Sequence, residues 1–163
     1  MIKEKLSTKN KSKWVNKKEF IIVHHTGTGE GTIKWVLNGF TWRDEKSCHY
    51  VVDTNWDVYK IGEDDDILWH CGESSWGEYK WMNSYSIGIE VIGPLKNGFT
   101  FEQRSTVKTL VRTIMDKYNI PKQNVLRHAH IAPKRKVDID LRFLNDSEGN
   151  KKYISWEHWQ NSL

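Results

Sequence analysis

The strongest structural signal in the chain is Phe20-Ile21-Ile22-Val23-His24-His25, which runs directly into Thr26-Gly27-Thr28-Gly29. The β-branched run predicts a buried strand, and the glycines among hydroxyl side chains predict the loop that ends it. Sheet proteins often place their sites at strand ends, so the two histidines at the end of this strand are candidates for chemistry. By two-residue alternation, His24 and His25 are expected on opposite faces of the sheet.

A second strand is predicted from Tyr85 to Ile92. Two-residue alternation places its aliphatic side chains on one face and Ser86, Gly88 and Glu90 on the other. The Glu90 carboxylate therefore lies beside two small residues, on a face with room for a ligand.

Helices and further strands alternate around these two strands. Apolar residues at three- and four-residue steps predict helices, and β-branched runs predict strands. The clearest helix begins at a capping box formed by Thr100 and Gln103 and should stop near Asn119. This alternation predicts an α/β protein, a single domain with a central mixed β-sheet flanked by helices. The other predicted elements are a helix over 33–40, a strand, turn and strand over 50–61, a short strand over 125–127, an ordered loop over 128–140 and a terminal helix over 155–163.

Length and composition describe a soluble globular domain. The chain has 163 residues, 37% of them apolar and 28% charged, with no repeat or low-complexity tract. This composition does not fit a disordered or fibrous protein, and the length is that of one ordinary domain. The longest wholly apolar run is Phe20 to Val23, which is too short for a transmembrane segment or a signal peptide. We therefore expect a protein that is synthesised in the cytoplasm. We also expect it to be a monomer.

Positive charge is concentrated at the N-terminus. Residues 1–19 hold seven lysines against Glu4 and Glu19, whereas the rest of the chain has 18 Lys and Arg and 19 Asp and Glu. We therefore divide the chain into a basic N-terminal arm, residues 1–19, and a folded body, residues 20–163. The arm is expected to be solvated and frayed, or else to steer the protein to an anionic cell-envelope surface. Nucleic acid is not expected as a partner, because no base-reading motif accompanies these lysines.

The cysteines and tryptophans are interpreted mainly as packing residues. Cys48 and Cys71 form no CxxC pattern and are expected to be reduced, partly buried thiols. Nine tryptophans is a high number for this length, and Trp69, Trp76 and Trp81 crowd into one loop-like stretch. Their flat faces suit sugar rings, but core packing can also explain most tryptophans.

Histidines and carboxylates together suggest a metal centre. Imidazoles at strand ends, joined by a carboxylate such as Asp138, can supply three N or O ligands to zinc and leave the fourth position to water. Four motifs sharpen this possibility, and together they resemble the zinc amidases that cleave N-acetylmuramoyl-L-alanine bonds. That family includes phage endolysins, bacterial autolysins, wall-recycling amidases and peptidoglycan recognition proteins, and the resemblance covers about residues 20 to 143. The motifs are Ile22-Val23-His24-His25-Thr26, Trp69-His70-Cys71-Gly72, the run from Asn83 to Glu90 and the run from His128 to Asp138.

The resemblance implies a role for each matching residue. His24, His128 and Asp138 match the zinc ligands of the family. In the implied mechanism zinc polarises the amide carbonyl and lowers the pKa of its bound water. Glu90 then moves a proton from water to the leaving nitrogen, and Lys136 stabilises the oxyanion. The residues expected to contact substrate are Trp69, His70 and Asn83.

Three positions depart from the family pattern. The usual Pro-Gly after the third ligand is missing, so Asp140 competes with Asp138 for the metal. The ten-residue spacing from His128 favours Asp138, because a two-residue shift moves a carboxylate several ångströms along an extended chain. Cys71 stands where alanine is usual and is interpreted as a packing residue. Cys48 holds the place of a tyrosine that some phage members carry near the metal.

Three functions fit these observations, all with peptidoglycan or muropeptides as partners. The leading interpretation is a zinc-dependent N-acetylmuramoyl-L-alanine amidase of the phage endolysin type, with residues 20–163 as its catalytic domain. Such an enzyme is made in the cytoplasm and reaches the wall after host lysis. The first alternative is a cytoplasmic amidase of wall recycling, which acts on soluble anhydromuramoyl peptides. The second is a non-catalytic peptidoglycan-binding module, disfavoured because every candidate ligand and catalytic residue is present.

Overall fold

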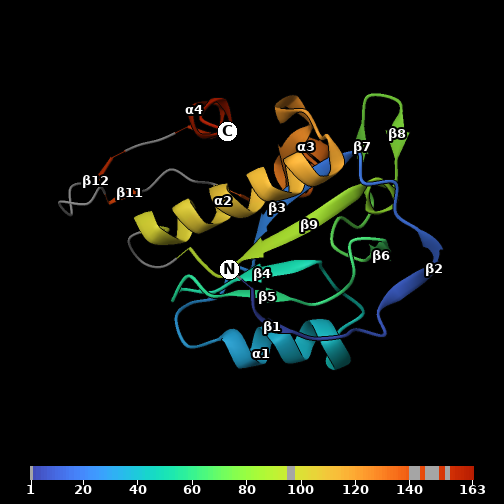
Figure 1. Ribbon diagram of the computed structural model, residues 1–163, viewed down its shortest axis with the longest axis horizontal. Coiled ribbons are helices and arrows are strands. Elements are labelled where there is room, and N and C mark those ends of the chain that lie inside the picture. The colour runs from blue at the N-terminus through green and yellow to red at the C-terminus, as the bar shows by residue number, and fades with distance from the viewer. Residues whose placement is uncertain (1, 95–97, 140–143, 146–150, 153–154) are drawn as a thin grey trace.

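A six-stranded mixed β-sheet forms the centre of the protein (Figure 1). The computed structural model describes residues 2–94, 98–139, 144–145, 151–152 and 155–163. The two strands predicted from the apolar runs, β3 and β9, are neighbours inside the sheet, which confirms the expected α/β architecture. β5 is antiparallel to β4, and the other neighbours are parallel. In spatial order the strands are β1 (Ile2–Lys5), β5 (Val58–Lys60), β4 (Tyr50–Val52), β9 (Ser86–Val91), β3 (Phe20–His25) and β10 (Val125–Arg127).

Parallel pairing of β3 with β9 fixes which side chains share a face. His24 is the register partner of Glu90. Register partners on neighbouring strands point to the same side, so these two side chains share one face of the sheet. The next residue, His25, points to the other face, where its ring centroid lies 6.3 Å from that of Phe99 in the core.

Two helices, α2 (Phe101–Tyr118) and α4 (Trp156–Asn161), cover that other face. The hydroxyl of Thr100 accepts the backbone N–H of Gln103, so Thr100 caps the start of α2 at the predicted residue. The Gln103 side chain does not complete the predicted capping box, because its amide donates to the carbonyl of Ile92. Asn119, in the left-handed conformation, ends it. None of the described helices combines the length and the apolar character that a membrane span needs. The core that α2 and α4 share with the strands includes Ile21, Val23, Ile87, Ile89, Val91, Val107, Leu110, Val111, Ile114, Trp156 and Trp159.

The first face of the sheet is covered in two separate parts. α1 (Ile33–Asn38) and the π-helical turn η1 (Gly39–Arg43) pack over β4 and β5 (Figure 1). The segment over 71–85 and α3 (His128–Ile131) pack over β3 and β10 through Ile22, Met82 and Ile131. His24 and Glu90 lie on this face. The remaining short elements are β2 (Lys11–Val15), β6 (Asp66–Leu68), β7 (Ser75–Trp76), β8 (Tyr79–Lys80), η2 (Met82–Ser84), η3 (Lys122–Asn124), β11 (Leu144–Asn145) and β12 (Lys151–Lys152).

Residues 2–5 and 11–15 form paired strands, so the expectation of a frayed arm is wrong. β1 is an edge strand of the six-stranded sheet, parallel to β5, and β2 pairs with β6. Strand pairing supplies hydrogen bonds to the backbone, and acidic turns supply counter-charges to the lysines. The composition of residues 1–19 reveals neither the strands that pair with this segment nor the acidic residues that balance its lysines. The ion pairs are Lys3 with Asp57, Lys11 with Asp66 and Lys18 with Asp65.

The segment predicted as an ordered loop over 128–140 begins instead with one helical turn, α3. Backbone bonds continue the turn, because the N–H of Ala132 donates to His128 and the N–H of Lys136 donates to Ala132. A single turn is too short to produce a helical pattern in the sequence. The turn brings the downstream residues back toward β3.

A buried carboxylate ties the β5–β6 connection to α2. The Asp64 side chain accepts the hydroxyls of Tyr50 at 2.6 Å and Tyr118 at 2.7 Å and the ammonium of Lys117 at 2.8 Å. Lys60 lies 3.4 Å away. Burial by itself raises the pKa of Asp64, but these donors outweigh it and hold the pKa well below its ordinary value. The network therefore stabilises the fold only while Asp64 is ionised.

We expect Asp64→Asn to lower the free energy of unfolding by about 2 kcal/mol at pH 7, because buried donors lose a charged acceptor. The pKa of Asp64 is depressed in the folded state, so its contribution is present above the unfolded pKa of about 4 and is lost as pH falls below that value. Urea unfolding of both proteins at pH 7 and pH 3 measures this, with Asp116→Asn, which changes an exposed carboxylate of α2, as the control. An equal difference in unfolding free energy at the two pH values would contradict the role of Asp64.

Candidate metal centre

The three predicted ligands meet at the end of β3. His24 lies on β3, and His128 begins α3 directly after β10, the parallel neighbour of β3. Asp138 follows α3, and its backbone carbonyl accepts the N–H of Ala129 at 2.6 Å. The Nδ1 atoms of His24 and His128 are 2.9 Å apart. The Oδ2 atom of Asp138 lies 3.1 Å from the His128 nitrogen and 3.7 Å from the His24 nitrogen.

These separations fit a tetrahedral ion. Ligands at about 2.0–2.2 Å from zinc stand about 3.3–3.6 Å from one another in a tetrahedron. The observed separations of 2.9, 3.1 and 3.7 Å bracket that spacing. All three side chains are buried, and His128 and Asp138 also line the adjacent cleft. A fourth ligand would therefore enter from the cleft.

His24 and Asp138 have the protonation states that a metal requires. Burial lowers the pKa of His24 to about 4, so its ring is neutral at pH 7. Burial by itself raises the pKa of Asp138, but the neighbouring rings of His128 and His24 outweigh it and hold the pKa far below its ordinary value. Neutral imidazoles and an ionised carboxylate are the forms that bind zinc.

A second group of possible ligands shares His24 but suits a metal less well. The Nε2 atom of His24 lies 3.0 Å from Nδ1 of His70, which lies 3.1 Å from Sγ of Cys71. Burial raises the pKa of the Cys71 thiol far above its ordinary value, so the sulfur stays protonated at pH 7. The set that contains Asp138 offers a negative charge and is the better metal site.

Glu90 and Lys136 lie beside the three ligands. Burial is the main cause that raises the pKa of Glu90 to about 8, with the charge of Asp138 acting in the same direction and Lys136 and then Lys46 opposing the rise. The Oε2 atom of Glu90 is buried and has no hydrogen-bond partner among the described residues. This carboxyl group is therefore free to act on a bound molecule.

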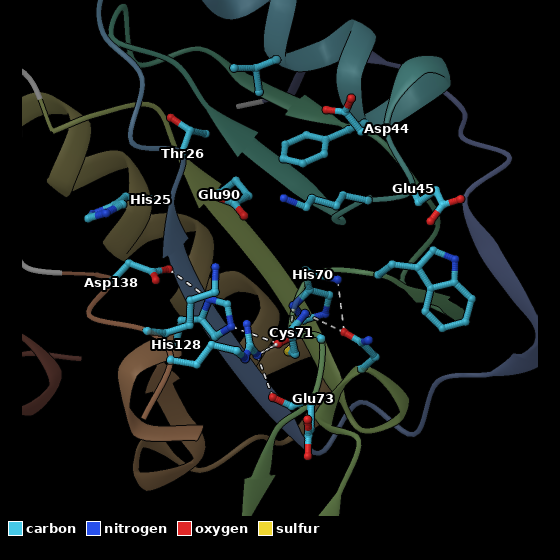
Figure 2. A pocket seen from close by; sticks show the side chains of 18 of the residues that line it. His25, Thr26, Asp44, Glu45, His70, Cys71, Glu73, Glu90, His128 and Asp138 are labelled. Atoms are coloured by element: carbon cyan, nitrogen blue, oxygen red, sulfur yellow. Dashed lines mark hydrogen bonds and ion pairs between the residues drawn. The ribbon is translucent and has the colours of Figure 1, made fainter. Parts of the chain in front are cut away.

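A cleft of about 610 Å³ opens in front of these groups. Figure 2 shows His128 and Asp138 on one side of it, Glu90 above them, and His70 and Cys71 to the right of His128. A volume of this size is typical of sites for small molecules. The structure thus brings all eight predicted site residues to one place. Besides His24 in its buried wall, these are Trp69, His70, Asn83, Glu90, His128, Lys136 and Asp138, all of which line the cleft.

The crowded tryptophans do not pack into the core. Trp69 and Trp76 are each 39% exposed, and Trp81 is 62% exposed. Trp69 and Trp81 line the cleft together with Trp35, which comes from α1. Trp76 does not line this cleft. Flat aromatic faces at the rim are suited to a sugar ring.

Two basic residues of the cleft were not predicted. Lys46 lines the cleft from the segment after η1, and no motif marks it in the sequence. The guanidinium of Arg135 donates to the carbonyls of Cys71 at 2.8 Å and Glu73 at 2.7 Å. Its position next to Lys136 in the fourth motif was the signal that could have found it.

The departures from the family pattern have different outcomes. Cys71 is buried in the cluster around Met82, as a packing residue would be, and its thiol also lies beside His70. Cys48 is buried and donates to the carbonyl of Tyr50 at 3.4 Å. Asp140, the possible competitor for the metal, lies outside the described residues.

Comparison with known proteins identifies the family. The sequence profile of the N-acetylmuramoyl-L-alanine amidases matches residues 15–140. The chain belongs to this family. The 1,6-anhydro-N-acetylmuramyl-L-alanine amidase AmpD of Haemophilus influenzae is 29% identical over 118 residues, 72% of this chain and 58% of the relative. The amidase AmiD of Escherichia coli is 32% identical over 90 residues, 50% of this chain and 33% of the relative. The matches thus span only about half the length of the AmpD relatives.

Solved structures of amidases share the fold. A selenomethionine derivative of AmpD superposes with a TM-score of 0.70 at 22% identity, covering 85% of this chain and 88% of that one. A mutant endolysin from Bacillus subtilis gives 0.67 at 24% identity, covering 82% and 88%. AmiD of Escherichia coli, bound to the substrate anhydro-N-acetylmuramic acid-L-Ala-D-gamma-Glu-L-Lys, gives 0.65 at 26% identity, covering 78% and 54%. These matches confirm the amidase fold.

We expect His128→Ala to lose zinc, because two ligands cannot hold the ion against dialysis. His130→Ala, on the same helical turn, is the matched control and should keep it. Elemental analysis of dialysed protein measures the zinc content per chain. A full equivalent of zinc in His128→Ala would contradict the assignment of this ligand.

Proposed function

We propose that the protein is a zinc-dependent amidase that hydrolyses the bond between N-acetylmuramic acid and L-alanine. The observation that carries the proposal is the convergence of His24, His128 and Asp138 within 2.9–3.7 Å of one another at an open cleft. Glu90, the register partner of His24, adds an unpartnered carboxyl group beside them. Three protein ligands with an open position and a nearby general base are the components of metal-assisted amide hydrolysis. Membership of the amidase family supports the same reaction.

Glu90 and Lys136 have different roles in the proposed reaction: Glu90 moves a proton, and Lys136 stabilises negative charge. Zinc at this site would polarise the amide carbonyl and lower the pKa of bound water to about 7. Burial is the main cause that raises the pKa of Glu90 to about 8. Its carboxylate is therefore a stronger base than an ordinary one. It would take a proton from the water that attacks the carbonyl carbon and deliver that proton to the nitrogen that leaves as the C–N bond breaks. Lys136 holds a positive charge near the site of the developing oxyanion, which is the general role of preorganised charge.

A soluble anhydromuramoyl peptide is the substrate that the comparisons favour. The AmpD relatives are named for that substrate class, and the structural neighbour AmiD holds a molecule of it. The order of the two enzyme interpretations is therefore the reverse of the one expected from the sequence. A cleft of about 610 Å³ is of the size that admits such a ligand, with Trp69 and Trp81 at hand for its sugar.

Lytic action on the wall polymer is the second candidate, and the continuity of the cleft favours it. A second cavity of about 550 Å³ adjoins the cleft, and Glu73, Trp81 and Arg135 line both. Lys80 and Lys134 line only the second cavity. A cleft that continues in this way can receive a polymer strand. In this case the protein would act as a phage-type endolysin after host lysis.

The two candidates predict different products. We expect chelator-sensitive release of stem peptide from soluble anhydromuramoyl tripeptide, restored by zinc, and slower release from intact sacculi. Mass spectrometry of both reactions identifies the products. Faster release from sacculi would favour the lytic candidate. Binding of both substrates without release from either would contradict the amidase proposal and favour a binding module.

We expect Glu90→Gln to lower kcat/KM by about 10² to 10⁴, because the amide cannot carry the proton. Its zinc content should equal that of the wild type, since Glu90 is not a ligand. Glu102→Gln, in the first turn of α2 on the opposite face, is the matched control and should have wild-type kinetics. Wild-type kcat/KM in Glu90→Gln would refute its role as the base.

A further inference from the structure

Two consecutive residues contact the far sides of both histidine ligands. The rings of His24 and His128 point their Nδ1 atoms at the position that a metal ion would occupy. The Nε2 atom of His24 lies 3.0 Å from Nδ1 of His70, and the Nε2 atom of His128 lies 3.0 Å from the carbonyl oxygen of Cys71. His70 and Cys71 therefore contact the two histidine ligands on the sides that face away from the metal position.

The direction of these hydrogen bonds follows from the chemistry of the acceptors. A carbonyl oxygen only accepts, so His128 donates its Nε2 proton to Cys71 and keeps Nδ1 free for a metal. Metal binding through Nδ1 of His24 likewise leaves its proton on Nε2, which donates to Nδ1 of His70. The His70 proton is then on its own Nε2, which is buried and has no partner among the described residues.

The two acceptors are themselves held in place. The side-chain oxygen of Asn83 accepts the backbone N–H groups of His70 at 3.1 Å and Cys71 at 2.7 Å. The His70 ring lies against the backbone of Gly88, where a Cβ atom would stand 2.5 Å from its Cγ and Nδ1 atoms. Only glycine leaves room for the ring at this point of β9. The acceptor positions are therefore set by packing and not by the metal.

We propose that His70 is a positioning residue for the metal, and that His70 and Cys71, fixed by Asn83 and Gly88, form an outer clamp that orients both histidine ligands. This inference rests on the proposed zinc centre but not on the proposed reaction. It assigns His70 and Asn83 to the metal centre, whereas the sequence suggested direct contact with substrate. Outer partners of this kind typically change metal affinity by about 10- to 100-fold.

Zinc affinity, measured by competition with a chromophoric chelator at pH 7.5, tests the clamp without substrate. His70→Leu removes the acceptor and should weaken zinc binding by about 10- to 100-fold. His70→Asn places an amide oxygen near the former Nδ1 position and should bind within a few-fold of the wild type. Gly88→Ala displaces the ring and should resemble His70→Leu. Gly29→Ala, where a Cβ meets nothing within 4 Å, is the matched control.

Unfolding of the metal-free proteins separates the clamp from general damage. If His70→Leu lowers the melting temperature of the metal-free protein, the zinc affinities of His70→Asn and His70→Gln are compared instead. The glutamine amide reaches past the Nδ1 position, whereas the asparagine amide does not. We then expect the asparagine variant alone to keep zinc affinity. Equal affinity in wild type and His70→Leu, or equal loss in both amide variants, would overturn the clamp. A wild-type protein that binds no zinc would instead overturn the proposed metal centre.

Discussion

Parallel pairing of β3 with β9 on one side and β10 on the other is the constraint on which the site depends. It sets His24 beside Glu90 and delivers His128 to the same end of the sheet. A slip of one residue in β9 would turn Glu90 toward α2 and bring Ile87 and Ile89 to the cleft side. The aliphatic core beneath α2 opposes that slip, because it buries both isoleucines. Core packing therefore holds the chemical groups in register.

The same burial governs the charges at the site. It keeps the His24 ring neutral, raises the pKa of Glu90 and leaves ionised Asp138 dependent on its two histidine neighbours. Carboxyl groups crowded away from water are costly to the folded protein unless a positive charge accompanies them. Lys136 supplies part of that charge, and a divalent cation bound by Asp138 would supply more. The buried carboxyl groups thus lower the stability of the metal-free protein, while they raise its affinity for a cation and the basicity of Glu90.

The parts of the fold that could be predicted depend on local patterns. Alternation along 85–92 placed Glu90 on the correct face, and Thr100 located the start of α2 because its cap hydrogen bond joins residues only three apart in the chain. Residues 1–19 could not be placed, since their strands depend on partners some 50 residues away. The contact between His70 and His24 was missed for the same reason. Resemblance to the family named both residues, but only the folded chain shows the hydrogen bond that links them.

Zinc K-edge X-ray absorption of the zinc-loaded protein reads the ligand set directly. Two imidazoles and the Asp138 carboxylate predict only nitrogen and oxygen scatterers, at about 2.0–2.2 Å, with the multiple-scattering signature of two histidine rings. A sulfur scatterer at about 2.3 Å would show instead that zinc is bound by Cys71 with His24 and His70. That result would contradict the assignment of the metal centre and the mechanism built on it.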